Sequence, residues 1–291
     1  MKRRALCVVL LTLALVSPSA RSGTLAQFRT SLGEIDVELY DEDKPVTVQN
    51  FIRYVQGGFY TNMFLHRCIP GFVAQGGGFR TDDPSSTALF GAFSSVGSFG
   101  PITNEFNVGR RFSNTYGTIA MAKTAGDPNS ATSQWFFNLA DNSANLDNQN
   151  GGFTVFGHIV GGTNVLETFN AMSLNNGVVD LRQYYTTNDT TSLLSDLPVT
   201  YAGARAPHYN ELIYADVSVT NLKLQVRSLD GGGREISWSS VGNRTNTVEF
   251  TTNFPPLWQP LLSTNGNGST LTVVDATSLN SRRFYRVRVD Y

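Results

Sequence analysis

Helical spacing of apolar residues is rare in this chain of 291 residues, and this restricts its fold more than any other feature. Only segments 44–55 and 163–172 are predicted to be helices, and in the first Val48, Phe51 and Val55 recur three and four positions apart. Elsewhere apolar and polar residues alternate in short runs between glycine-rich turns, which is typical of strands with one face in water. We therefore expect a mainly β fold.

The N-terminal segment differs from the rest of the chain. Residues 2–4 are basic, and residues 5–16 form a predominantly apolar run followed by small residues. Twelve residues rise only about 18 Å as a helix, which is too short for the roughly 30 Å hydrocarbon core of a bilayer. The pattern predicts a secretory signal peptide over residues 1–23, cleaved between Ser19 and Gly23. The alternative is a short N-terminal anchor.

Composition excludes several functional classes. The formal net charge is −1, which does not predict a nucleic-acid-binding protein, because such proteins carry a basic excess. The three histidines are far apart, so we expect no metal site and no cofactor. Loss of the signal peptide would remove Cys7 and leave Cys68 alone, so no internal disulfide is expected. It would also leave a mildly acidic mature chain without a stable membrane insertion.

Two blocks with different sequence patterns follow the signal peptide. The first, residues 24–220, mixes strand and helix patterns with Gly- and Ser-rich stretches at 94–100, 141–152 and 173–208, which are expected to be loops. The second, residues 221–291, contains only short alternating runs separated by turn residues. Runs of this length and spacing predict a small all-β sandwich.

One segment, FLHRCIPGFVAQGG at residues 64–77, combines a cation, a large aromatic ring and an amide donor within nine positions. Arg67 and Phe72 would be far apart on an extended strand that rises roughly 3.3 Å per residue. The turn at Pro70-Gly71 can instead bring them to one face, with Gln75 beside Arg67. Taken alone, the segment is better explained by a surface arginine and a core phenylalanine.

Two further segments favour the functional interpretation. One reads GTIAMAK followed by NSATSQWFF (117–137), and the other reads NLD followed by GFTVFG (145–157). With the first segment, and in this order, they resemble the cyclophilin family of peptidyl-prolyl cis-trans isomerases over residues 24–219. The sequence PITNEF at 101–106 is similar to that of the bacterial secreted members. The resemblance implies a closed eight-stranded antiparallel β-barrel with a helix over each open end.

The resemblance also implies a role for each matching residue. Arg67 would be the catalytic arginine, Phe72 would contact the substrate proline, and Gln75 would hold the guanidinium and contact the substrate backbone. The remaining residues would line the proline pocket or border the groove before it: Val73, Phe136, Leu146 and Phe153 in the pocket, and Ala122, Lys123 and Gln134 along the groove. His66 is expected to be a core histidine rather than a base.

The implied partners are proline-containing peptides and unfolded or folding proteins. The protein would be a monomer in the periplasm or outside a bacterial cell. Asn145 stands where some members carry a tryptophan that helps to hold cyclosporin, so weak cyclosporin binding is expected. A non-catalytic peptide-binding protein is the competing hypothesis. The C-terminal block weakly resembles fibronectin- or immunoglobulin-like modules, which would act as a spacer or recruit partners.

Overall fold

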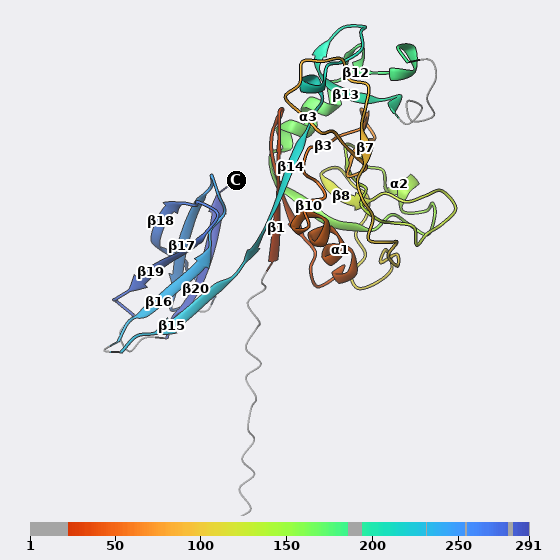
Figure 1. Ribbon diagram of the computed structural model, residues 1–291. Coiled ribbons are helices and arrows are strands. Elements are labelled where there is room, and N and C mark those ends of the chain that lie inside the picture. Colours follow the sequence, from red (N-terminus) through yellow and green to blue (C-terminus); the bar gives the residue numbers. More distant parts are fainter. Residues whose placement is uncertain (1–22, 186–193, 231, 254, 279–281, 291) are drawn as a thin grey trace, which may run out of the picture.

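The computed structural model describes residues 23–185, 194–230, 232–253, 255–278 and 282–290, and its ribbon is shown in Figure 1. The predicted signal peptide lies outside the described residues except for Gly23, which begins the first strand. The fold is mainly β, as predicted, and its strands belong to one large sheet and several small ones.

The large sheet has eight strands in the order β14-β1-β2-β10-β8-β9-β5-β4, and each neighbouring pair is antiparallel. Their bounds are β1 Gly23–Thr30, β2 Gly33–Leu39, β4 Arg67–Ile69, β5 Val73–Gly76, β8 Thr118–Met121, β9 Trp135–Asn138, β10 Val155–Gly161 and β14 Ala215–Leu222. Helix α1 (Pro45–Gln56) contacts β14, and helix α3 (Thr163–Asn170) contacts β2. Both helices lie where the sequence predicts them.

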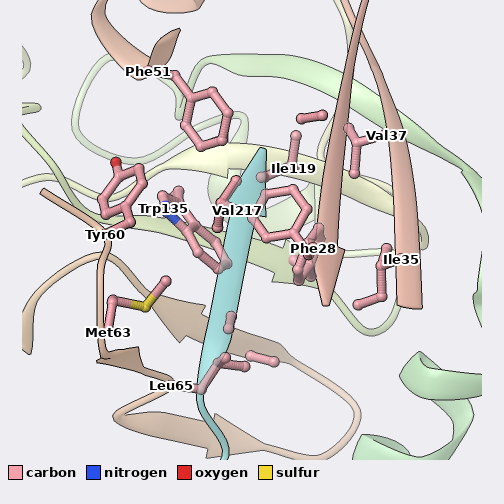
Figure 2. Close-up of a cluster of buried hydrophobic side chains, with 14 of the residues drawn as sticks. Phe28, Ile35, Val37, Phe51, Tyr60, Met63, Leu65, Ile119, Trp135 and Val217 are labelled. Carbon is pink, nitrogen blue, oxygen red and sulfur yellow. The ribbon is translucent and has the colours of Figure 1, made fainter. Parts of the chain in front are cut away.

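Aromatic side chains fill the core of this sheet (Figure 2). The Phe28 ring lies 4.9 Å from the Trp135 ring and 5.2 Å from the Phe137 ring, measured between centroids, in edge-to-face contacts. Phe51, on the buried face of α1, belongs to the same cluster, and its ring centroid lies 5.9 Å from that of Phe28. The alternating pattern of β2 places Ile35, Val37 and Leu39 in this core.

The sheet is not the closed barrel that the family resemblance implied. In the described residues β14 and β4 are its two edges, and no strand ladder joins them. The edge of β4 is occupied by another segment, because the Cys68 N–H donates to the Asp196 carbonyl at 2.7 Å. Near the two edges, Phe64 and Tyr214 form one isolated antiparallel bridge, beside which the Leu65 N–H donates to the Ile213 carbonyl at 2.9 Å. The sheet is therefore curled but open.

Residues 173–208 are not a plain loop, contrary to expectation. They contain β11 (Ser173–Leu174), β12 (Asn176–Val179), the 3-10 turn η1 (Leu181–Gln183) and β13 (Leu197–Ala202), which precede the turn η3 (Tyr209–Glu211). The three strands form a small sheet with its own apolar cluster, in which Leu181, Leu194 and Leu197 are buried beside Phe64 and Phe90. Burial of these leucines stabilises the described parts of the segment, residues 173–185 and 194–208.

The other two expected loops also contain short elements. Strand β7 (Ser94–Ser95) joins β3 (Met63–Phe64) and β6 (Phe79–Arg80) in a small sheet. Helix α2 (Ser143–Leu146) forms one turn within the stretch 141–152.

The C-terminal strands form two three-stranded antiparallel sheets where a small all-β module was predicted. One contains β15 (Leu224–Ser228), β16 (Arg234–Ser239) and β19 (Thr270–Asp275), and the other β17 (Thr245–Thr251), β18 (Gln259–Asn265) and β20 (Phe284–Asp290). Strand β18 was not predicted; it is an edge strand that contains Pro260. The division at residue 220 stays a prediction, and β14 runs two residues past it.

A group of charged side chains joins the C-terminal sheets to the large sheet. Arg244 contacts Asp36 of β2 at 2.6 Å and Glu34 at 3.0 Å. The Asp36 carboxylate is fully buried and also accepts a hydrogen bond from the Gln27 amide at 2.9 Å. These contacts satisfy a charge on the face of β2 that points away from the core.

Candidate active site

The β4–β5 hairpin brings Arg67 and Phe72 together, as the sequence predicts. Its turn contains Pro70 and Gly71, and Gly71 has a φ of +71°, which favours glycine. The Arg67 guanidinium carbon lies 5.8 Å from the centroid of the Phe72 ring. The Arg67 side chain is 35% exposed, so its donors can reach a ligand.

Gln75 lies directly opposite Arg67 in the β4–β5 ladder. Side chains of directly opposed residues are close enough to interact across a strand pair. The Gln75 amide nitrogen donates to the Gln134 side-chain oxygen at 2.8 Å, so both predicted polar residues belong to one network. This bond fixes the donor end of Gln75 beside Arg67.

The predicted apolar pocket residues gather in one cluster. Val73, Phe136 and Leu146 are at most 5% exposed and form its buried part. The rings of Phe136 and Phe153 meet edge to face with centroids 5.9 Å apart. Half-buried residues complete the cluster at the surface: Phe72, Ala122 and Phe153. A partly accessible apolar patch therefore lies next to Arg67.

Four members of the same cluster were not predicted: Tyr40, Phe112, Ala120 and Val155. The Tyr40 and Phe112 rings stack with centroids 3.9 Å apart. Phe112 belongs to a stretch outside the helices and strands, where the sequence has no periodicity to reveal a buried contact. Val155 lies within the quoted motif GFTVFG and begins β10, whose first three residues are buried, so its apolar side chain in the motif could have indicated its burial.

Polar residues that the sequence analysis did not select hold the backbone of the aromatic residues. The Asn142 amide donates to the Phe72 carbonyl at 2.8 Å, and the Leu139 N–H donates to the same oxygen at 2.8 Å. The Asn114 amide donates to the Phe153 carbonyl at 3.0 Å and to the Asp147 carboxylate at 2.8 Å. These bonds fix the two rings that flank the patch.

Lys123, which is predicted to border the groove, has its ammonium group bound to backbone carbonyls. Its ammonium donates to the Asn150 carbonyl at 2.6 Å and to the Gly152 carbonyl at 2.7 Å, and it lies 4.7 Å from the Phe153 ring centroid. Burial lowers the pKa of Lys123 to about 8, although the charge of Asp127 opposes this shift. Lys123 therefore binds the loop that precedes Phe153.

His66 is a core residue, as the sequence predicts, and 4% exposed. Burial and the charge of Arg67 lower its pKa to about 3, although a hydrogen bond with Gln134 opposes them. The imidazole is therefore neutral near pH 7. Cys68 is also buried, and burial together with the charge of Asp196 raises the pKa of its thiol to about 12. Neither group is suited to acid–base or nucleophilic chemistry at neutral pH.

One neighbour of Arg67 was not predicted. The Asp196 carboxylate lies 4.0 Å from the Arg67 Nε, although the two residues are far apart in the sequence. Among the described residues, no group of three or more His, Cys, Asp or Glu side chains is placed to hold a metal ion. The same residues contain no helix that is both long and apolar enough to span a bilayer.

Comparisons with known proteins agree on one family. The model of the cyclophilin type peptidyl-prolyl cis-trans isomerases matches residues 25–189. A peptidyl-prolyl cis-trans isomerase of Acinetobacter baylyi is 40% identical over 155 residues, covering 53% of this chain and 75% of that protein. Peptidyl-prolyl cis-trans isomerase A of Dickeya dadantii is 39% identical over 182 residues, covering 60% and 88%. A crystal structure of a cyclophilin type isomerase from Cryptosporidium parvum, determined in the presence of the dipeptide Ala-Pro, is 22% identical with a TM-score of 0.44, covering 68% and 99%.

Proposed function

The chain belongs to the cyclophilin-type peptidyl-prolyl cis-trans isomerase family, and we propose that Arg67 and the apolar patch beside it carry out its reaction. The substrates would be X–Pro bonds in unfolded or folding proteins. The observation that carries this proposal is the position of a half-exposed guanidinium 5.8 Å from the Phe72 ring, at the edge of the patch.

Rotation about an X–Pro amide is slow because it removes the resonance of the bond, at a barrier of about 18–20 kcal/mol. In the twisted transition state the imide nitrogen regains a localised lone pair. A guanidinium is always protonated and presents a rigid set of donors. Arg67 would therefore form stronger hydrogen bonds with the twisted amide than with the planar one, which lowers the barrier.

The apolar patch has the complementary task of holding the proline ring while the acyl side rotates. Phe72, Phe136 and Phe153 would contact the ring and keep water from competing for the donors of Arg67. The path needs no covalent intermediate and no metal, because no bond is broken.

The magnitudes indicate that Arg67 does not act alone. Lowering the barrier by roughly 7 kcal/mol accelerates exchange about 10⁵-fold. One charge-assisted hydrogen bond contributes about 1.5–3 kcal/mol. The patch and the network of Gln75 would supply the remainder by excluding water and aligning the substrate.

An exchange assay tests the assignment of Arg67. The chain without residues 1–23 should accelerate the cis-to-trans exchange of a proline peptide, and Arg67→Ala should reduce this acceleration about tenfold to hundredfold. Arg29→Ala, which removes a half-exposed arginine of β1, is the matched control and should keep full activity. Equal activity of the wild type and Arg67→Ala would refute the role of Arg67.

Binding of proline peptides without any acceleration would instead support the competing hypothesis, in which the chain is a peptide-binding protein. The affinity of the same peptides for the wild type and Arg67→Ala should therefore be measured in parallel. Two further proposals need measurements of their own. Cyclosporin should bind weakly, because Asn145 stands where some family members carry tryptophan. Sedimentation should show that the protein is a monomer.

Export is proposed from the N-terminal pattern. Basic residues 2–4 and the apolar run that follows support removal of residues 1–23 as a signal peptide. The protein would then act on secreted or envelope proteins of a bacterium. N-terminal sequencing of the protein recovered from cell fractions should find a new terminus between Ser19 and Gly23. Recovery of the full chain from the membrane fraction would favour the anchor.

A further inference from the structure

Asp196 is fixed beside Arg67 by its backbone and by its side chain. Its carbonyl accepts the hydrogen bond from the Cys68 N–H that occupies the edge of β4. Its carboxylate accepts a hydrogen bond from the Ser195 hydroxyl at 2.8 Å. The next residue, Leu197, is fully buried in the apolar cluster of the 173–208 segment. The carboxylate is therefore held at this place by contacts that do not involve Arg67.

The charge of Asp196 acts on two arginines. The Asp196 carboxylate lies 4.0 Å from the Arg67 Nε, and the two side chains are 37% and 35% exposed. Asp196 also contributes to raising the pKa of Arg182, after the larger effect of the hydrogen bond from Arg182 to Asp180. Because Asp180 already neutralises Arg182, the charge of Asp196 mainly offsets that of Arg67.

This arrangement has a consequence for substrates. An isolated guanidinium in the site would attract acidic side chains near the substrate proline and repel basic ones. A carboxylate held about 4 Å from it replaces much of that positive field by the weaker field of a dipole. Specificity depends on such differences between competing substrates.

We propose that Asp196 is a specificity-determining residue of the isomerase site. Its carboxylate lies 4.0 Å from the Arg67 Nε, and it offsets the charge of Arg67 so that acidic residues beside the substrate proline gain no advantage. The inference rests on the proposed function of Arg67, and it adds a residue that comes from a segment far along the chain.

The expected size follows from Coulomb's law. In a water-like dielectric, a unit charge about 8–10 Å from a substrate charge changes the rate for one charged peptide about twofold at low salt. The effects on a Glu and a Lys peptide have opposite signs, so the ratio of their rates shifts about fivefold. Salt should reduce this shift, because exposed charges at this separation are screened within roughly one Debye length.

The experiment compares two peptides that differ only in a Glu or a Lys next to the proline, with the full chain as enzyme. Asp196→Asn should raise the Glu-to-Lys ratio of kcat/KM about fivefold at low salt, and this change should shrink at high salt. A neutral peptide should change little. Asp196→Glu keeps the charge and should keep the wild-type ratio, whereas Asp216→Asn removes an exposed charge on β14 and should also leave it unchanged.

An unchanged ratio in Asp196→Asn would overturn the inference. The backbone bond to Cys68 survives this substitution, and a thermal unfolding curve confirms that the variant is folded. The affinities of the Glu and Lys peptides are measured in parallel, so that their Glu-to-Lys ratio tests the inference even if the protein does not accelerate exchange. Loss of the inference is distinguishable from loss of the proposed function, because Arg67→Ala on the neutral peptide tests the latter separately.

Discussion

The large sheet and the C-terminal sheets are stabilised by different kinds of contact. The large sheet buries a cluster of aromatic rings, including Phe28 and Trp135, with no exposed surface. In the C-terminal sheets the buried cluster is Ile236, Trp238 and Val248, and the residues packed against it are half-buried. The difference indicates that the stability of the large sheet, which carries the site, depends on apolar burial, whereas the C-terminal sheets are also stabilised by charged contacts.

Those charged contacts lie on both C-terminal sheets. Asp275 is buried and accepts hydrogen bonds from Arg283 at 2.5 Å and from the Tyr285 hydroxyl at 2.8 Å. Glu249 accepts from Arg286 at 2.6 Å and from Arg288 at 3.3 Å. A small region buries a smaller share of its surface than a large one, so polar contacts make up a larger part of its stability.

The largest expected effect is on the aromatic core. Phe28→Ala removes a ring in contact with Phe51, Trp135 and Phe137, and should lower the free energy of unfolding of the large sheet by about 3–5 kcal/mol. Denaturant titration followed by tryptophan fluorescence measures this loss. Phe284→Ala is the matched control, because that side chain is 50% exposed. An equal loss of unfolding free energy in Phe28→Ala and Phe284→Ala would contradict the conclusion that the large sheet depends on its buried aromatic core.

Asp275→Asn should have the next largest effect, confined to the C-terminal sheets. The substitution leaves the Arg283 guanidinium, which is 12% exposed, without its carboxylate, at a cost of about 3 kcal/mol in unfolding free energy. Differential scanning calorimetry should show the C-terminal transition shifted and the other unchanged. Asp230→Asn, at an exposed turn, should shift neither transition. A shift of the large-sheet transition instead would show that the two regions unfold as one unit.

The smallest effect is the acid response of Glu249. Burial opposes the shift, but hydrogen bonds from Arg286 and Arg288 hold the pKa of Glu249 below its usual value of 4.5. Its stabilising contribution is therefore complete above about pH 4.5 and is lost as the pH falls through the lowered pKa. Glu249→Gln should remove this part of the acid sensitivity, at a cost of about 1 kcal/mol at neutral pH.

The control for this last prediction is Glu235→Gln, which removes a more exposed pair with Arg227 on the other C-terminal sheet. The measurement is the midpoint of the C-terminal transition between pH 3 and 7. An identical acid response in the wild type and Glu249→Gln would show that other carboxylates set it.

The residues of the site that could be predicted are those that lie close together in the sequence or belong to a recognisable motif. Arg67, Phe72 and Gln75 lie within one hairpin, whose Pro-Gly turn is visible in the sequence. The patch residues come from separate segments, and it was the family resemblance that connected them. Their roles stay predictions, and the structure adds their proximity.

The features that were missed depend on contacts between distant segments. Nothing near Asp196 in the sequence indicates that it lies against Arg67, because that contact depends on how residues 173–208 fold. The same segment occupies the edge of β4, and this explains why the expected closed barrel is an open sheet. In β18, Pro260 interrupts the strand pattern at a register shift opposite β17.

The pairing of β1 with β14 has a mechanical consequence. Gly23 lies opposite Leu222, so the chain enters the large sheet and leaves it toward β15 at the same end. A force that pulls Gly23 and Leu222 apart would load the hydrogen bonds between β1 and β14 one after another, beginning beside these two residues, rather than all together. The sheet would unzip from this corner at a low force, and a translocation motor that pulled on the N-terminus would meet little resistance there.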